Sequence, residues 1–211
     1  AVTLGYTLAQ IGSEVTGFNG MVTLDGFSIF VNALLLVSGL LGVALGYGYI
    51  KRMGIERGEY YTLLLFSVVG MMLMAQATDL IVVFLALELL SIPLYVLAAF
   101  ARDKTDSEEA GLKYFLLGAF SSGFLVYGIA LIFGATHTTN IFAIVEFVST
   151  STGSLLLTIG AALLLIGFGF KVAVGDFNGD NFDDVAVFDA EHAVVPGAGA
   201  AGSSAIGRSG K

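Results

Sequence analysis

The sequence predicts an all-α polytopic membrane protein with five transmembrane helices and a short acidic tail that lies outside the membrane. Of the 211 residues, 56% are hydrophobic and only 12% are charged, whereas a soluble domain carries about 25% charged residues. Long apolar segments recur along the first 174 residues, and none alternates as an outer-membrane strand would. The net charge of −8 argues against nucleic acid as a partner, and the apolar segments point to the lipid bilayer.

Five segments approach or reach the roughly 20 apolar residues that cross a bilayer. In chain order, these expected spans are Phe27–Tyr49, Tyr60–Ala75, Leu80–Phe100, Ala110–Phe133 and Leu155–Val174. The second is short, but it can be extended at either end. Residues 1–26 form a leader without Lys or Arg. The apolar stretch Ile141–Val148 is too short to span, so it is expected to form an interfacial helix or a loop packed on the bundle.

The basic residues lie in alternate connections between the spans. Lys51, Arg52 and Arg57 follow the first span, and Arg102 and Lys104 follow the third. Cytoplasmic loops carry an excess of Lys and Arg. The leader is therefore predicted to lie outside the cell, and the two basic loops and the C-terminal tail are predicted to be cytoplasmic.

Glu88 is the most informative charge within these spans. It lies eight residues into the third span, about 12 Å along the helix and near the middle of a hydrocarbon layer of about 30 Å. A charge at this depth costs at least ~2.5–3.5 kcal/mol. The sequence therefore favours a proton-relay or ion-pathway residue over a carboxylate that serves only helix packing. Pro93 also leaves the Leu89 carbonyl without its helical hydrogen bond, which provides a place for water.

Two lysines lie near the ends of other spans. Lys113 is about one turn inside the fourth span, and Lys171 follows the Gly-rich stretch 167–170 near the end of the fifth. A lysine near a helix end can extend its ammonium group to the membrane interface. Each lysine therefore has two interpretations, a snorkelling side chain or a partner of Glu88 in a proton switch.

The segment Leu85–Phe100, which contains Glu88 and Pro93, resembles the signature of subunit N of bacterial NADH-quinone oxidoreductase, respiratory complex I. Four further blocks resemble the same family in the same order. They are Leu24–Ser28, Gly58–Phe66, Gly111–Phe120 and Gly167–Lys171. The resemblance covers approximately residues 18–173.

The resemblance implies an antiporter-like membrane subunit of a proton-translocating enzyme, with no redox centre in this chain. NADH, FMN, iron–sulfur clusters and quinone are implied for other subunits, which are the expected partners in the bacterial inner membrane. By resemblance, Glu88 pairs with Lys171 two spans later, and Lys113 is a further lysine of the proton route. The separation between Glu88 and Lys171 would govern when the lysine takes up or releases its proton.

The resemblance also has limits. Members of the family carry two helices before the block that contains Asp25 and seven more after the lysine that matches Lys171. A complete pair of half-channels is therefore not expected from these residues.

The segment that follows the membrane region resembles an unrelated family, the FG-GAP repeat of integrin-type propellers. Ca²⁺ takes 6–8 oxygen ligands, and the spacing of the repeat assigns them to the side chains of Asp176, Asn178, Asp180 and Asp184 and to the carbonyl of Phe182. The other interpretation is an acidic turn without metal. Residues 194–211 are rich in Gly, Ala and Ser and are expected to form a flexible end.

Three functions follow from these observations. The first is the complex I subunit with a part in proton translocation. The second is a calcium-binding or adhesion module tethered to a membrane bundle. The third is a non-functional truncated or chimeric fragment, in which residues 175–211 have been joined from another gene.

Overall fold

The structure, a computed structural model, describes most of the first 172 residues and two short strands beyond them. The described ranges are 2–55, 57–101, 105–150, 154–172, 174–175 and 184–185. The chain divides into two compact units, Ala1–Val172 and Ala173–Lys211. In the second unit, β3 (Val174–Gly175) pairs with β4 (Asp184–Val185) in an antiparallel register.

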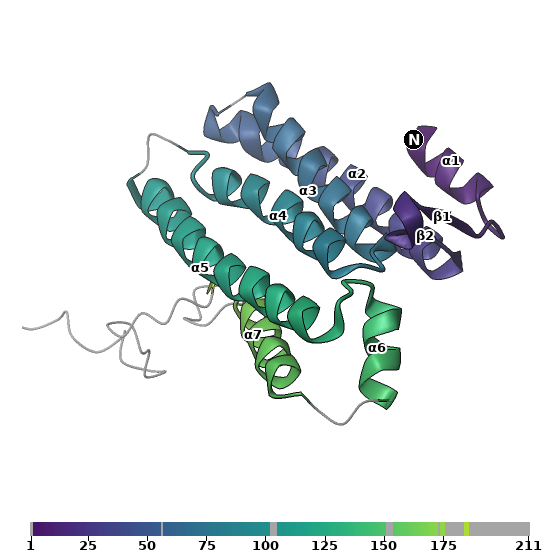
Figure 1. The fold of residues 1–211 in the computed structure, drawn as a ribbon. Coiled ribbons are helices and arrows are strands. Elements are labelled where there is room, and N and C mark those ends of the chain that lie inside the picture. The colour runs from purple at the N-terminus through teal and green to yellow at the C-terminus, as the bar shows by residue number, and fades with distance from the viewer. Residues whose placement is uncertain are drawn as a thin grey trace, which may run out of the picture. The chain divides into compact units, whose positions relative to one another are not determined.

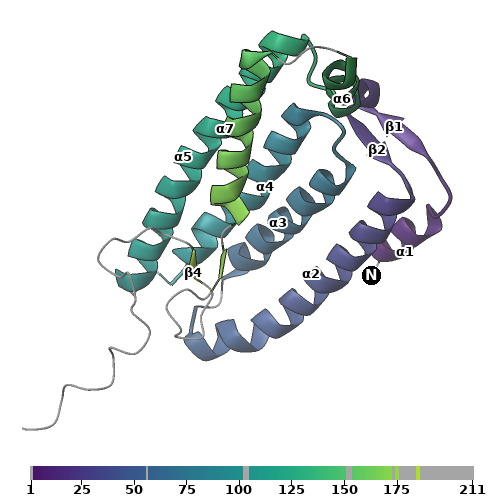
Figure 2. The same cartoon turned by 90° about the horizontal axis from the view of Figure 1, so that it is seen from below.

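The first unit is a bundle of long apolar helices. They are α2 (Gly26–Met53), α3 (Gly58–Gln76), α4 (Leu80–Ala98), α5 (Thr105–Thr136) and α7 (Leu155–Val172). Neighbouring helices pack in the order α2, α3, α4 and α5, and α7 lies against α5 (Figures 1 and 2). In the described residues, α2, α3, α4 and α5 are long and apolar enough to cross a membrane, and α7 is apolar but shorter. The all-α membrane fold class is confirmed, and a fifth span formed by α7 stays a prediction.

The ends of α2 follow from local sequence signals. Asp25 and Ser28 form a capping box, in which the Ser28 N–H donates to Oδ1 of Asp25 at 2.7 Å and the Asp25 N–H donates to Oγ of Ser28 at 2.8 Å. At the other end, Gly54 has φ 68°, and its N–H bonds to the Ile50 and Lys51 carbonyls. This left-handed conformation suits glycine and ends the helix.

The leader folds into a short helix and a hairpin. Helix α1 (Val2–Ala9) is followed by β1 (Val15–Gly17), the 3-10 turn η1 (Phe18–Gly20) and β2 (Val22–Leu24). The strands pair antiparallel, with Val15 opposite Leu24. The hairpin is tied to the turn before α4, because Thr78 donates its N–H to Met21 O at 3.0 Å and its hydroxyl to Gly20 O at 2.6 Å.

The same turn also holds the segment between α5 and α7. That segment forms helix α6 (Ile141–Thr150), so the helical interpretation of this stretch is the one observed. Asp79, which is 3% exposed, accepts the Ile81 N–H at 2.9 Å and the Thr139 hydroxyl at 2.6 Å. These bonds cap α4 and attach the start of α6 to it.

Small residues bring α5 and α7 into close contact. A Cβ atom at Gly160 would lie 3.0 Å from the Gly128 carbonyl oxygen, and one at Gly167 would lie 2.6 Å from Leu125. The Ser121 hydroxyl donates to the Gly167 carbonyl across this contact at 2.7 Å. Small residues and interhelical hydrogen bonds are typical of helix association in lipid.

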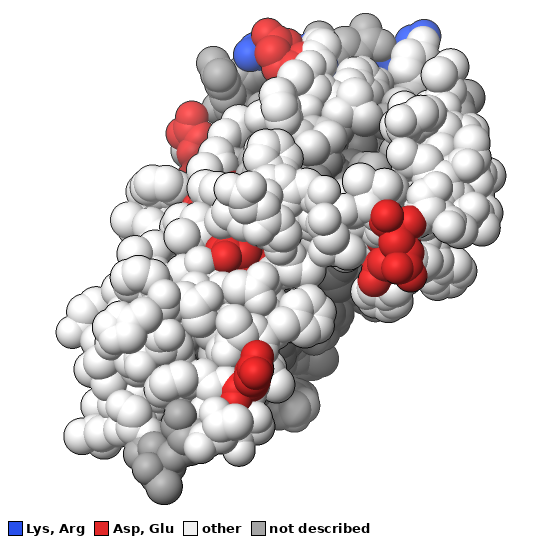
Figure 3. Space-filling view, turned by 45° about the vertical axis from the view of Figure 1, so that its right-hand side comes forward, with Lys and Arg blue, Asp and Glu red and all other residues white. Residues whose placement is uncertain are grey.

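The outer surface of the bundle is strongly apolar. On α2, the exposed side chains include Phe27, Phe30, Leu41 and Leu45. On the face drawn in Figure 3, uncharged residues cover most of the surface, and the visible Lys and Arg side chains lie toward one end. Such a surface is suited to lipid or to further apolar helices.

Candidate functional site

Glu88 and Lys171 form a salt bridge within the bundle. Glu88 lies near the middle of α4, and Lys171 lies in the last turn of α7. The Nζ atom of Lys171 is 2.9 Å from Oε1 of Glu88, and 5% of the lysine side chain and 23% of the glutamate side chain are exposed. Residues 83 positions apart in the sequence thus form one charged centre.

Three oxygen atoms surround the Lys171 ammonium group. Besides Glu88 Oε1, Nζ donates to the hydroxyl of Tyr95 at 3.1 Å and to Oγ of Ser91 at 3.4 Å. An ammonium group has three N–H donors, so each donor has an acceptor. The Tyr95 ring adds a cation–π contact, with Nζ 5.8 Å from its centroid. These contacts offset the hydration that the ammonium group loses on burial.

The helical spacing of α4 explains why three of these groups converge. Residues 88, 91 and 95 are separated by three and four positions, which places them on one face of a helix. That face is directed at α7, where Lys171 extends toward it. The sequence of α4 therefore supplies the glutamate and two neutral oxygen atoms from a single helical stripe.

Helix α5 adds a hydroxyl group to the glutamate. Oγ of Ser122 lies 2.6 Å from Glu88 Oε1 and 2.9 Å from the Gly118 carbonyl oxygen. A hydroxyl has one proton to donate, so it can bond to the carboxylate or to its own helix backbone. Ser122 can therefore release Glu88 and still have a hydrogen-bond acceptor, the Gly118 carbonyl.

Lys113 occupies a different environment. Its Nζ atom is 2.9 Å from Oε1 of Glu109, one helical turn earlier, and the two side chains are 51% and 64% exposed. An exposed pair of this kind contributes about 0–1 kcal/mol. The structure brings Glu88 and Lys171 together and places Lys113 in this separate pair on α5.

The expected calcium ligands fall almost entirely beyond the described residues. Asp176, Asn178, Asp180 and Phe182 lie outside them, and Asp184 is described only through its backbone, in β4. Over the described ranges, no group of three or more His, Asp or Glu side chains is placed to hold a metal ion. A calcium site in the tail stays a prediction.

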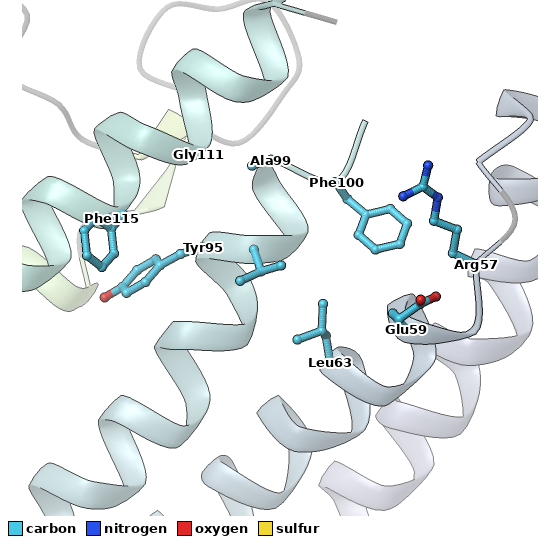
Figure 4. A pocket seen from close by; sticks show the side chains of 9 residues that line it. Arg57, Glu59, Leu63, Tyr95, Ala99, Phe100, Gly111 and Phe115 are labelled. Atoms are coloured by element: carbon cyan, nitrogen blue, oxygen red, sulfur yellow. The ribbon is translucent and has the colours of Figure 1, made fainter. Parts of the chain in front are cut away.

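A cavity of about 470 Å³ lies where α3 begins and α4 ends (Figure 4). Arg57 directly precedes α3 here, and Lys51 and Arg52 lie in the last turn of α2, so we refer to this end as the basic-loop end of the bundle. The lining residues come from three helices and from the loops that adjoin them. They are Arg57, Glu59, Leu63, Tyr95, Val96, Ala99, Phe100, Gly111 and Phe115.

Sequence reasoning missed the neutral members of this centre. Ser91 and Tyr95 were detectable, because they share the helical stripe of Glu88 in a segment already singled out for its charge. Ser122 gave no comparable signal, since the sequence of α5 does not indicate which face of the helix meets α4. Its contact with Glu88 depends on tertiary packing alone.

Comparison with known proteins defines the class of the bundle. Residues 77–179 match the family described as NADH:quinone oxidoreductase/Mrp antiporter, transmembrane region. A second match, to the FG-GAP repeat, covers residues 168–206. These matches confirm the two resemblances noted in the sequence.

The curated relatives are more specific. The chain is 48% identical over 182 residues to NADH-quinone oxidoreductase subunit N 2 of Roseiflexus castenholzii, covering 84% of this chain and 36% of the relative. It is 50% identical over 169 residues to NADH-quinone oxidoreductase subunit N of Trichlorobacter lovleyi, covering 79% of this chain and 35% of the relative. The chain therefore spans about a third of the length of these relatives.

Solved structures show the same likeness. A chain of respiratory complex I from Thermus thermophilus with bound aureothin matches with a TM-score of 0.64 and 34% identity, over 83% of this chain and 37% of that chain. A chain of the membrane-bound sulfane sulfur reductase, an archaeal respiratory membrane complex, matches with a TM-score of 0.59 and 22% identity, over 80% and 36%. The second match supports the fold alone.

Proposed function

We propose that this chain contributes part of a proton-translocation path to the membrane domain of a bacterial NADH-quinone oxidoreductase. The observation that carries the proposal is the Glu88–Lys171 salt bridge, which lies within apolar helices and has a separation of 2.9 Å. Ionisable residues at such positions are rare, and they mark proton relays and ion pathways. The similarity to subunit N of this enzyme supports the same assignment.

The geometry suggests how the pair would work. With Glu88 ionised, its carboxylate and the hydroxyls of Ser91 and Tyr95 hold the proton on Lys171. If Glu88 moves away or is neutralised, the ammonium group loses the charged partner that the described residues give it, and release of its proton becomes favourable. Ser122 permits this change, since its hydroxyl can turn to the Gly118 carbonyl.

Lys113 belongs to the same proposal in a secondary role. It lies on α5, the helix that also contributes Ser122, and its exposed pair with Glu109 lies near the start of that helix. The family resemblance assigns it to the proton route. In an assembled enzyme, the exposed ammonium group would exchange protons with groups outside this chain.

The chemistry of electron transfer is assigned to other subunits of the complex. NADH, FMN, iron–sulfur clusters and quinone would act there, and this chain would respond to the charge changes that they produce. Other membrane subunits and the lipid bilayer are the proposed partners. The chain would thus be part of a translocase without a redox centre of its own.

The distribution of basic residues supports an orientation in the bacterial inner membrane. Lys51, Arg52 and Arg57 cluster at the basic-loop end, which the positive-inside rule assigns to the cytoplasm. The leader hairpin and α6 would then face the outside, and the tail after α7 would be cytoplasmic.

A calcium-binding or adhesion module is the alternative that the FG-GAP match over residues 168–206 brings. The curated relatives are subunits N of NADH-quinone oxidoreductase, so this alternative is not favoured. Sequencing of the source DNA across the codons for residues 168–184 separates a continuous fusion from a chimeric fragment. A continuous reading frame would mean that the tail belongs to the protein and needs a function. A break there would remove the tail, and with it the calcium-binding alternative.

The proposal is tested in inverted membrane vesicles from cells that carry this chain. We expect Glu88→Gln to lower NADH-driven proton uptake by about 10²-fold, measured with a pH-sensitive dye and normalised to the amount of tagged chain. Glu146→Gln, the same change on the exposed surface of α6, is the matched control and should retain uptake. Unchanged uptake in Glu88→Gln, or recovery of the tagged chain without other membrane subunits, contradicts the proposal.

A further inference from the structure

Helix α6 is apolar, yet the rest of the described chain covers little of it. Most of its 10 residues are hydrophobic, and the structure, which describes all of them, buries none. Phe142, Val145 and Val148 have exposed fractions from 51% to 70%. They recur every three positions, so they form one stripe along the helix. We refer to these three residues as the α6 stripe.

Both ends of α6 lie at the same end of the bundle. The Ile141 N–H donates to the Thr78 carbonyl at 2.9 Å, which holds the start of α6 beside the start of α4. The start of α7 lies beside the end of α5, since a Cβ atom at Gly134 would be 3.4 Å from Cδ2 of Leu156. The chain therefore leaves the bundle and returns to it at one end. We refer to it as the hairpin end, because Thr78 also bonds to the leader hairpin.

The hairpin end lies near one surface of the membrane. Helices α4 and α5 are long and apolar enough to cross a bilayer, so the start of α4 and the end of α5 are expected near the same membrane surface. A helix of 10 residues is about 15 Å long and cannot cross a hydrocarbon layer of about 30 Å. Figure 2 shows α6 nearly end-on, whereas α5 and α7 are seen from the side. Helix α6 therefore runs across the long helices, as a helix that lies along the membrane surface does.

The residues of α6 divide into an apolar side and a polar side. Ile141, Ile144 and Phe147 are half-buried, and the α6 stripe continues this apolar side onto the exposed surface. Glu146 and Thr150, four positions apart, form the polar side. The apolar side is thus wider than the part that the rest of the described chain covers. A helix with this distribution is suited to the interface between lipid and water.

The exposed apolar surface continues from α6 onto its neighbours in the chain. Phe133 is exposed near the end of α5, and Leu155 and Ile159 are exposed near the start of α7. Since α5 is long and apolar enough to cross the membrane, lipid that surrounds its exposed side chains also reaches the α6 stripe. This continuity favours lipid over water or a separate protein as the material that covers the stripe.

We propose that α6 is an interfacial anchor that binds the lipid surface at the hairpin end. The α6 stripe inserts among the upper parts of the acyl chains, and Glu146 stays in water. Binding of this kind depends on the apolar area that enters the lipid and on attraction to anionic head groups. Because α6 contains no Lys or Arg, only the apolar area contributes. The role is independent of the proton path, since neither Glu88 nor Lys171 takes part in it.

The first test compares two neighbouring positions with the same probe. The chain contains no cysteine, so Val145→Cys and Glu146→Cys each provide one site for a nitroxide spin label in phosphatidylcholine vesicles. Electron paramagnetic resonance then measures collisions of the label with oxygen, which concentrates in lipid, and with a nickel chelate, which stays in water. The label at position 145 should collide mainly with oxygen, and the label at position 146 mainly with the chelate. Replacing part of the lipid with phosphatidylglycerol should change neither result.

Three outcomes of this test overturn the inference. Equal collision of both labels with the chelate would place the α6 stripe in water. Protection of the label at position 145 from both reagents would mean that a second copy of the chain or another protein covers the stripe. Lipid contact that appears only with phosphatidylglycerol would mean that head-group charge, and not apolar area, holds the helix.

The second test uses no label. Val145→Asn reduces the apolar area of the α6 stripe, and Thr150→Asn is the control on the polar side. Val, Thr and Asn have similar helix propensities, so the two variants differ mainly in their effect on lipid contact. In phosphatidylcholine vesicles, the backbone amides of α6 should exchange hydrogen faster in Val145→Asn than in the parent, and at the parental rate in Thr150→Asn. Equal exchange rates in the two variants, measured by mass spectrometry, would contradict the anchor.

Discussion

The Glu88→Gln substitution tests whether the buried salt bridge has the energetic consequence that its geometry implies. Glutamine has nearly the same shape as glutamate, so packing around α4 is preserved and only the charge is lost. Lys171, whose side chain is 5% exposed, would retain the hydroxyls of Ser91 and Tyr95 but no anionic partner among the residues that the structure describes. An ammonium group in this position lacks the compensation that made its burial tolerable.

The expected destabilisation follows from the burial of the two partners. Breaking a buried ion pair by removing one partner costs about 3–5 kcal/mol. Because 23% of the Glu88 side chain is exposed, the lower end of that range, about 3 kcal/mol, applies here. Substituting both residues, as Glu88→Gln with Lys171→Met, removes the orphaned charge and should recover part of the loss.

The measurement is the free energy of unfolding of the chain in mixed micelles, titrated with a denaturing detergent and followed by far-UV circular dichroism. Glu146→Gln on α6 is the control for a change of charge on an exposed side chain, and we expect a change within about 0.5 kcal/mol. If Glu88→Gln is no more destabilising than this control, the pair does not stabilise the bundle. A double variant whose loss equals the sum of the single losses would show that the two residues are uncoupled.

Three further predictions concern the fold that supports the site. Gly160→Leu should destabilise the bundle by about 1–3 kcal/mol through overpacking, whereas Gly169→Leu, which faces open space on the same helix, should cost little in the same unfolding titration. The Ser28 N–H lowers the pKa of the Asp25 carboxyl group below its usual value of 3.8. The Asp25 cap therefore stabilises the fold by about 1 kcal/mol above that pH, and this stabilisation is lost as the pH falls through the lowered pKa. Unfolding titrations of Asp25→Ala and the parent should therefore differ at pH 7 and converge under strongly acidic conditions. Asp79→Ala should speed hydrogen exchange at the start of α6, measured by mass spectrometry, because it removes a buried acceptor; unchanged exchange would show that this attachment is dispensable.

The membrane fold and the central glutamate were predictable from composition and depth. Glu88 was identified because one carboxylate stood in the middle of a long apolar segment, where the cost of burial demands an explanation. The helix ends were less accessible. Helix α5 begins at Thr105, before the expected Ala110, since polar residues such as Glu108 and Glu109 continue the helix beyond its apolar part.

The assembly of the site depended on tertiary structure. Spacing within the chain could not show that Lys171 meets Glu88, and only the family resemblance implied it. Ser122 was not identified at all, because its partner lies on another helix and the sequence does not show which face of α5 meets that helix. Lys113 and Lys171 had similar positions in the sequence, since both lie near helix ends. In the structure, the carboxylate that pairs with Lys113 is exposed, whereas the one that pairs with Lys171 is only 23% exposed.

The most direct test of this account is the distance between the two charged groups in a lipid bilayer. Solid-state NMR on the chain in lipid vesicles, with ¹⁵N in lysine side chains and ¹³C in glutamate carboxyl groups, measures the dipolar coupling between Lys171 Nζ and Glu88 Cδ. The Lys171→Met variant identifies the signal. The 2.9 Å contact between Nζ and Oε1 predicts strong dephasing, as for nuclei within about 4 Å. Dephasing that is the same in Lys171→Met as in the parent would mean that the two groups do not meet, and the proposed proton-exchange centre would be wrong.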